Sequence, residues 1–191
     1  MSWPRSGDAL IIVDVQRDFL PGGALGVPLG DEVVAPLSRC AALFEQRGLP
    51  IFATRDWHPP DHCSFRAYGG TWPPHCVAGT PGAEFASGLA LPAGARVVSK
   101  ATDSQADAYS GFQGTDLAAQ LRKLGCTRVV LGGLATDYCV LATALDALAS
   151  GFDVIVLEDA VRGVELQPGD SVRALRQMQA AGALLERGSV G

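Results

Sequence analysis

The sequence predicts an α/β protein built on a mostly parallel sheet. Short apolar runs rich in β-branched residues alternate with segments whose apolar residues recur every three to four positions, an order typical of parallel strands joined by right-handed crossovers. The chain has 191 residues, of which 48% are hydrophobic, and this size and composition suit a single core. We therefore expect residues 1–191 to form one domain.

Five apolar runs are predicted to be strands. The first, at residues 9–15 (ALIIVDV), is interrupted only by Asp14, and a near-continuous apolar run indicates a strand that is covered on both faces. The other four lie at residues 51–54, 96–99, 129–131 and 153–157. A short edge strand can follow at residues 183–185.

Four segments are predicted to be helices, at residues 31–47, 116–124, 139–150 and 170–181. The first has apolar residues at helical spacing and stops at Gly48. Before the third, Gly132 and Gly133 break the preceding strand. Thr136 or Asp137 can then cap the helix, because a short side-chain oxygen accepts a hydrogen bond from an orphan amide.

Composition and charge exclude several classes of function. The chain carries 15 Lys and Arg against 20 Asp and Glu, a net charge of −5, and no basic run, which argues against nucleic-acid binding. It has no apolar stretch of membrane-spanning length and no signal-peptide pattern, so we expect a cytoplasmic protein without a membrane partner. Its 5 cysteines are widely spaced, and neither a disulfide framework nor a cysteine-based zinc site is expected.

Four chemically capable residues follow four successive predicted strands: Asp14, Asp56, Lys100 and Cys139. Each has an ordinary structural explanation when taken alone, such as a core thiol for Cys139 or a lysine reaching solvent for Lys100. Ligands of parallel sheets, however, bind beyond the carboxyl ends of the strands. Four such residues at one sheet edge therefore indicate a shared site.

The same four residues suit covalent acyl transfer. Cys139 lies in the first turn of a predicted helix, where unpaired amides and the positive end of the helix dipole favour a thiolate. In that scheme Asp14 takes the thiol proton, and Lys100 lowers the pKa of the thiol and keeps Asp14 ionised. Backbone amides near Ala135 and Cys139 would hold the oxyanion.

All three histidines of the chain lie in one segment beside Asp56: His58, His62 and His75. Imidazoles combined with one carboxylate are ligands that suit Zn²⁺, Fe²⁺ or Mn²⁺. A lone histidine would more simply be structural, but this clustering predicts one divalent metal ion. Such an ion could position the substrate or generate the hydroxide that splits an acyl-enzyme.

Five stretches together resemble one enzyme family, the nicotinamidases (pyrazinamidases) among the isochorismatase-like cysteine hydrolases. They are IIVDVQRDFLPGGALGV, TRDWHPPDHCSF, GGTWPPHCVAGTPGAEF, VSKATDSQADAYSGF and LGGLATDYCVLATALDA, and they span nearly the whole chain in the family's order. The resemblance implies a six-stranded, mostly parallel sheet between two helical layers. It also implies hydrolysis of nicotinamide, and of pyrazinamide, to the acid and ammonia through a cysteine thioester.

The resemblance also assigns residues. By it, Asp14, Lys100 and Cys139 match the catalytic triad, and the peptide bond between Leu134 and Ala135 should be cis. The metal ligands would be Asp56, His58 and His75, with His62 or Ser64 as a fourth. The aromatic residues that sandwich the pyridine ring would be Phe19, Trp72 and Tyr109.

Two other classes of function remain open at this point. One is a metal-free relative of the same family acting on another small substrate, and the Asp56, His58 and His75 cluster argues against it. The other is a catalytically dead binding or scaffold protein on the same fold, and an intact Asp14, Lys100 and Cys139 argue against that. The expected partner is a small aromatic amide, and the sequence is compatible with a homo-oligomer.

Overall fold

A computed structural model describes residues 3–188. Its centre is a six-stranded sheet in the order β3-β2-β1-β4-β5-β6, in which every neighbouring pair is parallel. The strands are β1 (Asp8–Val13), β2 (Ile51–Asp56), β3 (Arg96–Lys100), β4 (Arg128–Leu134), β5 (Asp153–Arg162) and β6 (Leu184–Glu186). The predicted α/β fold with a six-stranded parallel sheet is therefore confirmed.

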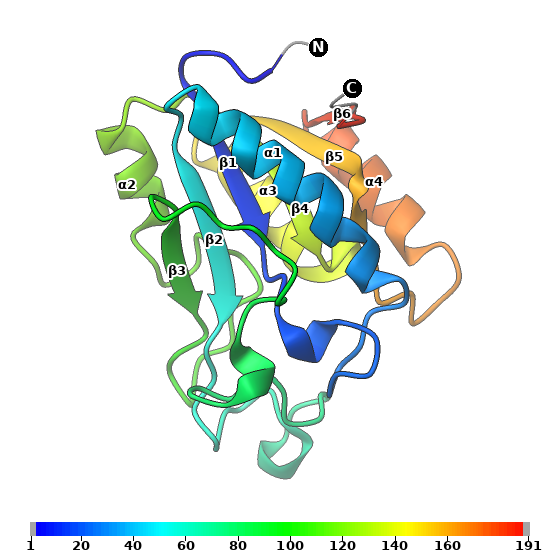
Figure 1. The fold of residues 1–191 in the computed structure, drawn as a ribbon. Helices are drawn as coiled ribbons and strands as arrows, with labels where there is room; N and C mark the ends of the chain where they lie inside the picture. The colour runs from blue at the N-terminus through cyan, green and yellow to red at the C-terminus, as the bar shows by residue number, and fades with distance from the viewer. Residues whose placement is uncertain (1–2, 189–191) are drawn as a thin grey trace.

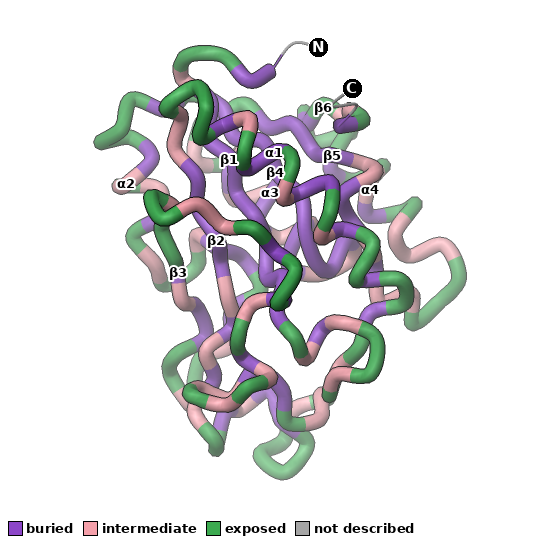
Figure 2. The backbone as a smooth tube through the Cα atoms, viewed as in Figure 1, coloured by how far each residue is buried: buried purple, intermediate pink, exposed green. Residues whose placement is uncertain are grey.

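The helices cover the two faces of the sheet and complete three layers (Figure 1). They are α1 (Val34–Gln46), α2 (Leu117–Lys123), α3 (Leu141–Ala149) and α4 (Asp170–Ala180). On β1, the side chains of Leu10 and Ile12 join the core on the α1 side, and those of Ile11 and Val13 join the core beneath α2, α3 and α4. All of β1 is buried, as the purple tube in Figure 2 shows, because both of its faces are covered.

Short helical turns occupy the loops. Four are 3-10 turns, at Arg17–Phe19, Gly30–Val33, Arg66–Tyr68 and Pro81–Ala83, and one is a π-helical turn at Thr136–Val140. In Figure 1 the arrows of β1, β2 and β3 point toward the end of the molecule where the long loops gather, and the other strands are parallel to them. That end is where a parallel sheet places its ligands.

The predicted start of the third helix was wrong in its detail. We expected Thr136 or Asp137 to cap it, but the π-helical turn begins after Ala135 without any side-chain cap. The carboxylate of Asp137 instead accepts hydrogen bonds from the amides of Val164 and Glu165, both at 2.9 Å. The Asp137 carboxylate therefore binds the backbone of a loop that is distant in sequence and lies nearby only in the folded protein.

Four strands run past their predicted ends: β2 reaches Asp56, β3 reaches Lys100, β4 reaches Leu134 and β5 reaches Arg162. β4 therefore continues through Gly132 and Gly133, which we expected to break it, and its pairing with β5 shifts register between Leu131 and Gly133. The polar residues Glu158 and Asp159 interrupt the apolar run of β5 and concealed its second half.

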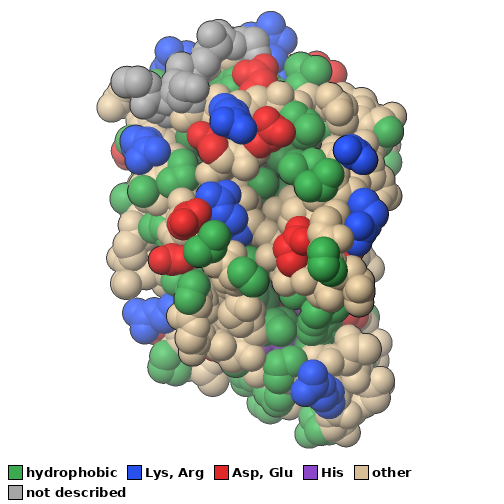
Figure 3. Space-filling view, turned by 90° about the vertical axis from the view of Figure 1, so that its right-hand side faces the viewer, with side chains coloured by type: hydrophobic (Ala, Val, Ile, Leu, Met, Phe, Trp, Pro, Cys, Tyr) green, Lys and Arg blue, Asp and Glu red, His purple; other side chains and the backbone are tan. Residues whose placement is uncertain are grey.

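The surface is of mixed charge. On the face shown in Figure 3, basic side chains are scattered singly among acidic and apolar ones. No helix within residues 3–188 has the length and apolar character needed to cross a membrane.

Candidate active site

The structure brings the four strand-end residues into one cluster. Asp14 directly follows β1 in a left-handed conformation with φ +49°, which is uncommon for a residue with a side chain. Asp56 and Lys100 are the last residues of β2 and β3 and face each other in register. Cys139 lies in the π-helical turn after β4. Adjacent parallel strands therefore deliver these groups to a single point.

Lys100 is the hub of this cluster and is completely buried. Its ammonium lies 3.0 Å from Oδ2 of Asp14, pairs with Oδ1 of Asp56, and donates to the carbonyl oxygen of Ala108 at 3.1 Å. Burial alone would lower the pKa of Lys100, but the charges of Asp14 and Asp56 outweigh it and hold the pKa well above its ordinary value. Lys100 is therefore a fixed cation.

Asp14 is buried beside the thiol. The hydroxyl of Thr54 donates to Oδ1 of Asp14 at 2.6 Å, and oxygens of Asp14 and Asp56 lie within 4.8 Å of each other and of the Cys139 sulfur. Burial raises the pKa of Asp14 above its ordinary value, against the lowering effect of Lys100. A raised pKa makes this carboxylate a stronger base than an exposed one.

Cys139 is buried, with its sulfur 3.5 Å from the Lys100 ammonium. Burial raises the pKa of its thiol well above the ordinary value. Lys100 opposes that rise, while Asp14 and Asp56 add to it. We expected the helix start and Lys100 to favour the thiolate. Lys100 does lower the pKa of the thiol, but burial and the two carboxylates outweigh it. A thiol with a raised pKa needs the base that the predicted scheme assigns to Asp14.

Three of the predicted metal ligands converge. One oxygen of Asp56 and one ring nitrogen each of His58 and His75 lie within 4.8 Å of one another, and all three residues are buried. Nδ1 of His58 lies 3.2 Å from the carbonyl oxygen of Ala101, and Nδ1 of His75 lies 2.8 Å from that of Pro73. A carbonyl can only accept, so each Nδ1 carries a proton, and in the neutral ring the lone pair that can bind a metal is then on Nε2.

This arrangement fits a divalent ion. Nε2 of His58 is buried and has no hydrogen-bond partner among residues 3–188, a state that is costly unless a ligand meets that nitrogen. Burial lowers the pKa of His75, which favours the neutral imidazole that binds metals. Two neutral imidazoles and one carboxylate are a donor set typical of zinc.

The two candidates for a fourth ligand differ in their surroundings. His62 uses both ring nitrogens: Nε2 lies 3.2 Å from the carbonyl oxygen of Ala106, and Nδ1 lies 2.8 Å from the hydroxyl of Ser64. Ser64 lines the cavity that contains Asp56, whereas His62 packs behind His58 with ring centroids 4.2 Å apart. The geometry favours Ser64 over His62.

Sequence reasoning missed Gln16, which fixes the backbone of Asp56. Its side-chain amide donates to the carbonyl oxygens of Asp56 at 2.8 Å and Ala83 at 2.9 Å, and its Oε1 accepts from the amide of Asp56 at 2.8 Å. A buried glutamine next to Asp14 was the available signal. Its partners are 40 and 67 residues away in sequence and could not be named.

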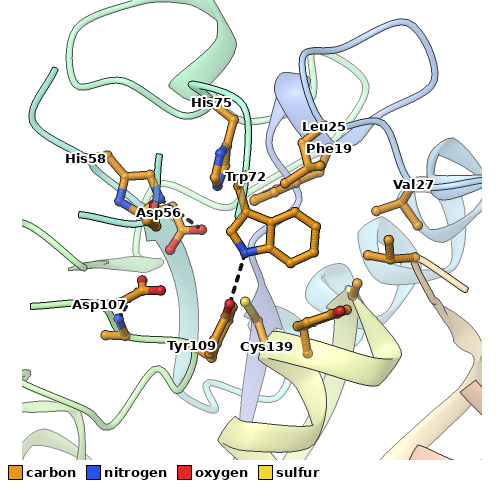
Figure 4. A pocket seen from close by; sticks show the side chains of 15 residues that line it. Phe19, Leu25, Val27, Asp56, His58, Trp72, His75, Asp107, Tyr109 and Cys139 are labelled. Carbon is orange, nitrogen blue, oxygen red and sulfur yellow. Dashed lines mark hydrogen bonds and ion pairs between the residues drawn. The ribbon is translucent and has the colours of Figure 1, made fainter. Parts of the chain in front are cut away.

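The cavity above the cluster has aromatic walls (Figure 4). Phe19, Trp72 and Tyr109 all line it, as predicted, and the indole of Trp72 donates to the Tyr109 hydroxyl at 3.0 Å. Tyr138, which sequence reasoning did not single out, packs edge-on against Trp72 with ring centroids 5.2 Å apart. Val164 completes the wall from the loop that Asp137 holds.

The backbone positions predicted for the oxyanion also reach the cavity. Ala135 and Cys139 both line it, and the peptide bond between Leu134 and Ala135 is cis, as expected. The amides of Tyr138 and Val140 both donate to the Ala135 carbonyl oxygen at 3.1 Å. The role of Ala135 and Cys139 as oxyanion donors stays a prediction.

Comparison with known proteins gives consistent matches. A family model described as "Isochorismatase domain" matches residues 8–187. The chain is 40% identical over 198 residues to a nicotinamidase of Escherichia coli (strain K12), covering 93% of each chain. It is 41% identical over 184 residues to a nicotinamidase/pyrazinamidase of Mycobacterium tuberculosis, covering 91% of this chain and 95% of that one.

A solved structure is also similar. The crystal structure of pyrazinamidase of Pyrococcus horikoshii in complex with zinc superposes with a TM-score of 0.91 and 52% sequence identity. The match covers 95% of this chain and 99% of that chain. The likeness therefore extends over the sheet, the helices and the loops that form the cavity.

Proposed function

The chain belongs to the isochorismatase family, and we propose that it is an amidase that hydrolyses nicotinamide to nicotinic acid and ammonia, and pyrazinamide likewise. The observation that carries this proposal is the buried hub. Lys100 contacts two carboxylates and a thiol at the floor of an aromatic cavity that also holds three metal-ligand side chains. Neither a scaffold nor a metal-free hydrolase needs all of these groups together.

The first half of the reaction transfers the acyl group to Cys139. Asp14 accepts the thiol proton as the sulfur attacks the amide carbon, and Lys100 stabilises the charge that moves between them. When the C–N bond breaks, the proton passes from Asp14 to the leaving nitrogen and ammonia departs. A thioester between the substrate acyl group and Cys139 remains.

The second half returns the free thiol. Water adds to the thioester carbon while Asp14 accepts its proton. As the C–S bond breaks, Asp14 returns that proton to the leaving sulfur, which gives the carboxylic acid, the Cys139 thiol and an ionised Asp14. In both halves the backbone amides of Ala135 and Cys139 hold the negative charge that develops on the carbonyl oxygen.

Asp56, His58 and His75 would hold one divalent ion, with Ser64 as the favoured fourth side chain. Zinc is the first choice because a structural relative is a zinc complex, and Fe²⁺ or Mn²⁺ suit the same donors. When bound, such an ion supplies Lewis-acid character next to the reacting group. Gln16 contributes by fixing the Asp56 backbone, so that the carboxylate can serve both the ion and Lys100.

The aromatic walls select a flat heteroaromatic substrate. Phe19, Trp72 and Tyr109 would enclose a pyridine or pyrazine ring and offer both apolar burial and ring stacking. The hydrogen bond between Trp72 and Tyr109 fixes the relative orientation of two of these walls.

Ammonia release tests this function directly. Purified protein loaded with zinc should release ammonia from nicotinamide and pyrazinamide, and far more slowly from a small aliphatic amide. Protein stripped of metal by a chelator should lose this activity and regain it on metal addition. Full activity in metal-free protein would indicate the metal-free class of relative, and no activity with any amide would indicate the catalytically dead class.

A further inference from the structure

The 15 residues that line the cavity include two carboxylates, those of Asp56 and Asp107, but no lysine or arginine. Asp56 pairs with the buried Lys100, so its charge is matched from below. Asp107 comes from the loop after β3, and sequence reasoning did not single it out.

Asp107 has no cationic partner. Its Oδ1 accepts a hydrogen bond from the amide of Ala108 at 2.9 Å, and within the described part of the chain no ion pair includes its side chain. Figure 4 shows its carboxylate on the side of the cavity where Asp56 and His58 lie. Its charge also acts locally: after burial, Asp107 is among the causes that raise the pKa of Tyr109.

The loop that carries Asp107 is fixed at the next two residues of the chain, Ala108 and Tyr109. The carbonyl oxygen of Ala108 accepts from the Lys100 ammonium at 3.1 Å, and the Tyr109 hydroxyl accepts from the Trp72 indole at 3.0 Å. These contacts fix the segment that follows Asp107. The amide of Ala108, which donates to Oδ1 of Asp107, holds the carboxylate at the cavity.

We propose that Asp107 is a specificity-determining residue that disfavours carboxylate ligands in the cavity. The inference rests on the proposed function, in which a neutral amide enters and a carboxylate remains after ammonia leaves. A like charge across a partly desolvated cavity raises the free energy of the bound product but not that of the bound amide. Asp107 thereby favours the neutral substrate over its own acid and promotes product departure.

Equilibrium binding to an inactive protein tests this proposal. In zinc-loaded Cys139→Ala protein, calorimetry gives the dissociation constants of nicotinamide and nicotinate, with and without Asp107→Asn. Asparagine keeps the size of the side chain and the acceptor for the Ala108 amide but removes the charge. We expect nicotinate to bind about three- to tenfold more tightly in the Asp107→Asn variant, a change typical of one screened charge pair.

Asp103→Asn is the matched control. Asp103 is an exposed residue of the same loop whose Oδ1 accepts from the amide of Gln105 at 3.0 Å, and it does not line the cavity. Its substitution should leave nicotinate affinity within twofold, a shift that is small on the scale of one exposed charge. Added salt should tighten nicotinate binding more in protein that retains Asp107 than in the Asp107→Asn variant, because salt screens a like-charge repulsion.

Unchanged nicotinate affinity in Asp107→Asn would overturn the inference. Weaker nicotinamide binding with unchanged nicotinate affinity would also overturn it, because Asp107 would then be a hydrogen-bond acceptor for the amide. The proposed function is judged separately by ammonia release from the unsubstituted enzyme. Ammonia release with unchanged nicotinate affinity removes only the inference, whereas no ammonia release and no binding of either ligand removes both.

Discussion

Replacing Lys100 by methionine would expose the electrostatic cost of the site. Methionine matches the length of the lysine stem and leaves no large cavity, so the main change is loss of one positive charge. That charge is buried, 3.0 Å from Asp14 and paired with Asp56. Breaking a buried ion pair from one side costs about 3–5 kcal/mol. We expect Lys100→Met to lower the free energy of unfolding by that amount and to abolish ammonia release.

The loss should depend on pH in a defined direction. Lys100 lowers the pKa of both Asp14 and Asp56, so both carboxylates titrate at higher pH once it is gone. A folded-state pKa that is raised makes folding less favourable as pH rises through it, and the protonated carboxyls need no partner. The stability deficit of Lys100→Met should therefore be larger near neutral pH than in mild acid. Urea unfolding of metal-free protein at both pH values measures it.

A second substitution separates charge from shape. Adding Asp14→Asn to Lys100→Met removes one of the two unpaired carboxylates, so stability should be partly restored while activity stays absent. A Lys100→Met deficit below about 1 kcal/mol, the size of an exposed pair, would refute the argument that this ion pair is energetically buried. So would a double variant that is no more stable than Lys100→Met alone.

Three further substitutions test individual roles. Asp14→Asn should lower kcat by about 10²–10⁴-fold, the usual contribution of a general base, and a change confined to KM would assign Asp14 to binding instead. His58→Ala should lower bound metal and activity together, measured by metal analysis beside the ammonia assay, and retained metal would remove His58 from the site. Trp72→Ala should raise KM for nicotinamide by up to about tenfold, the scale of one aromatic pair, and by less for an aliphatic amide, with little change in Tm. A constant ratio of kcat/KM between the two amides would show that Trp72 only packs.

Much of the site could be read from the sequence because parallel strands end at a common edge. Asp14, Asp56 and Lys100 each lie at the end of an apolar run, and the structure brings them within contact of one another. The strand runs themselves were clear because β1 is covered on both faces and carries almost no polar residue. The pattern of apolar residues was sufficient to predict a strand where that pattern reflects the burial of the strand.

The remaining features depend on contacts between distant segments. The carboxylate of Asp137 accepts hydrogen bonds from the amides of Val164 and Glu165, which lie 27 and 28 residues away. These partners could not be inferred from the sequence, which therefore suggested that Asp137 caps the helix. The two candidates for a fourth metal ligand, His62 and Ser64, could be ranked only once the contacts of His62 with Ser64 and Ala106 were visible. The ionisation of the Cys139 thiol likewise depends on contacts that the sequence does not show.

For Cys139 the sequence shows a helix start and a lysine, both of which favour a thiolate, but it does not show the degree of burial. Burial is the largest cause of the raised pKa of Cys139, and two carboxylates add to it. A thiol with a raised pKa depends on a base, which is the role that the predicted scheme assigns to Asp14.

The central claim is that Cys139 carries the acyl group during turnover. Acid quenching of zinc-loaded protein during nicotinamide hydrolysis, followed by intact-mass and peptide mass spectrometry, tests it most directly. We predict that one nicotinoyl group replaces one thiol hydrogen, that it maps to the peptide containing Cys139, and that Cys139→Ala protein carries none. A nicotinoyl group on another residue, or rapid ammonia release by Cys139→Ala protein, would contradict the account.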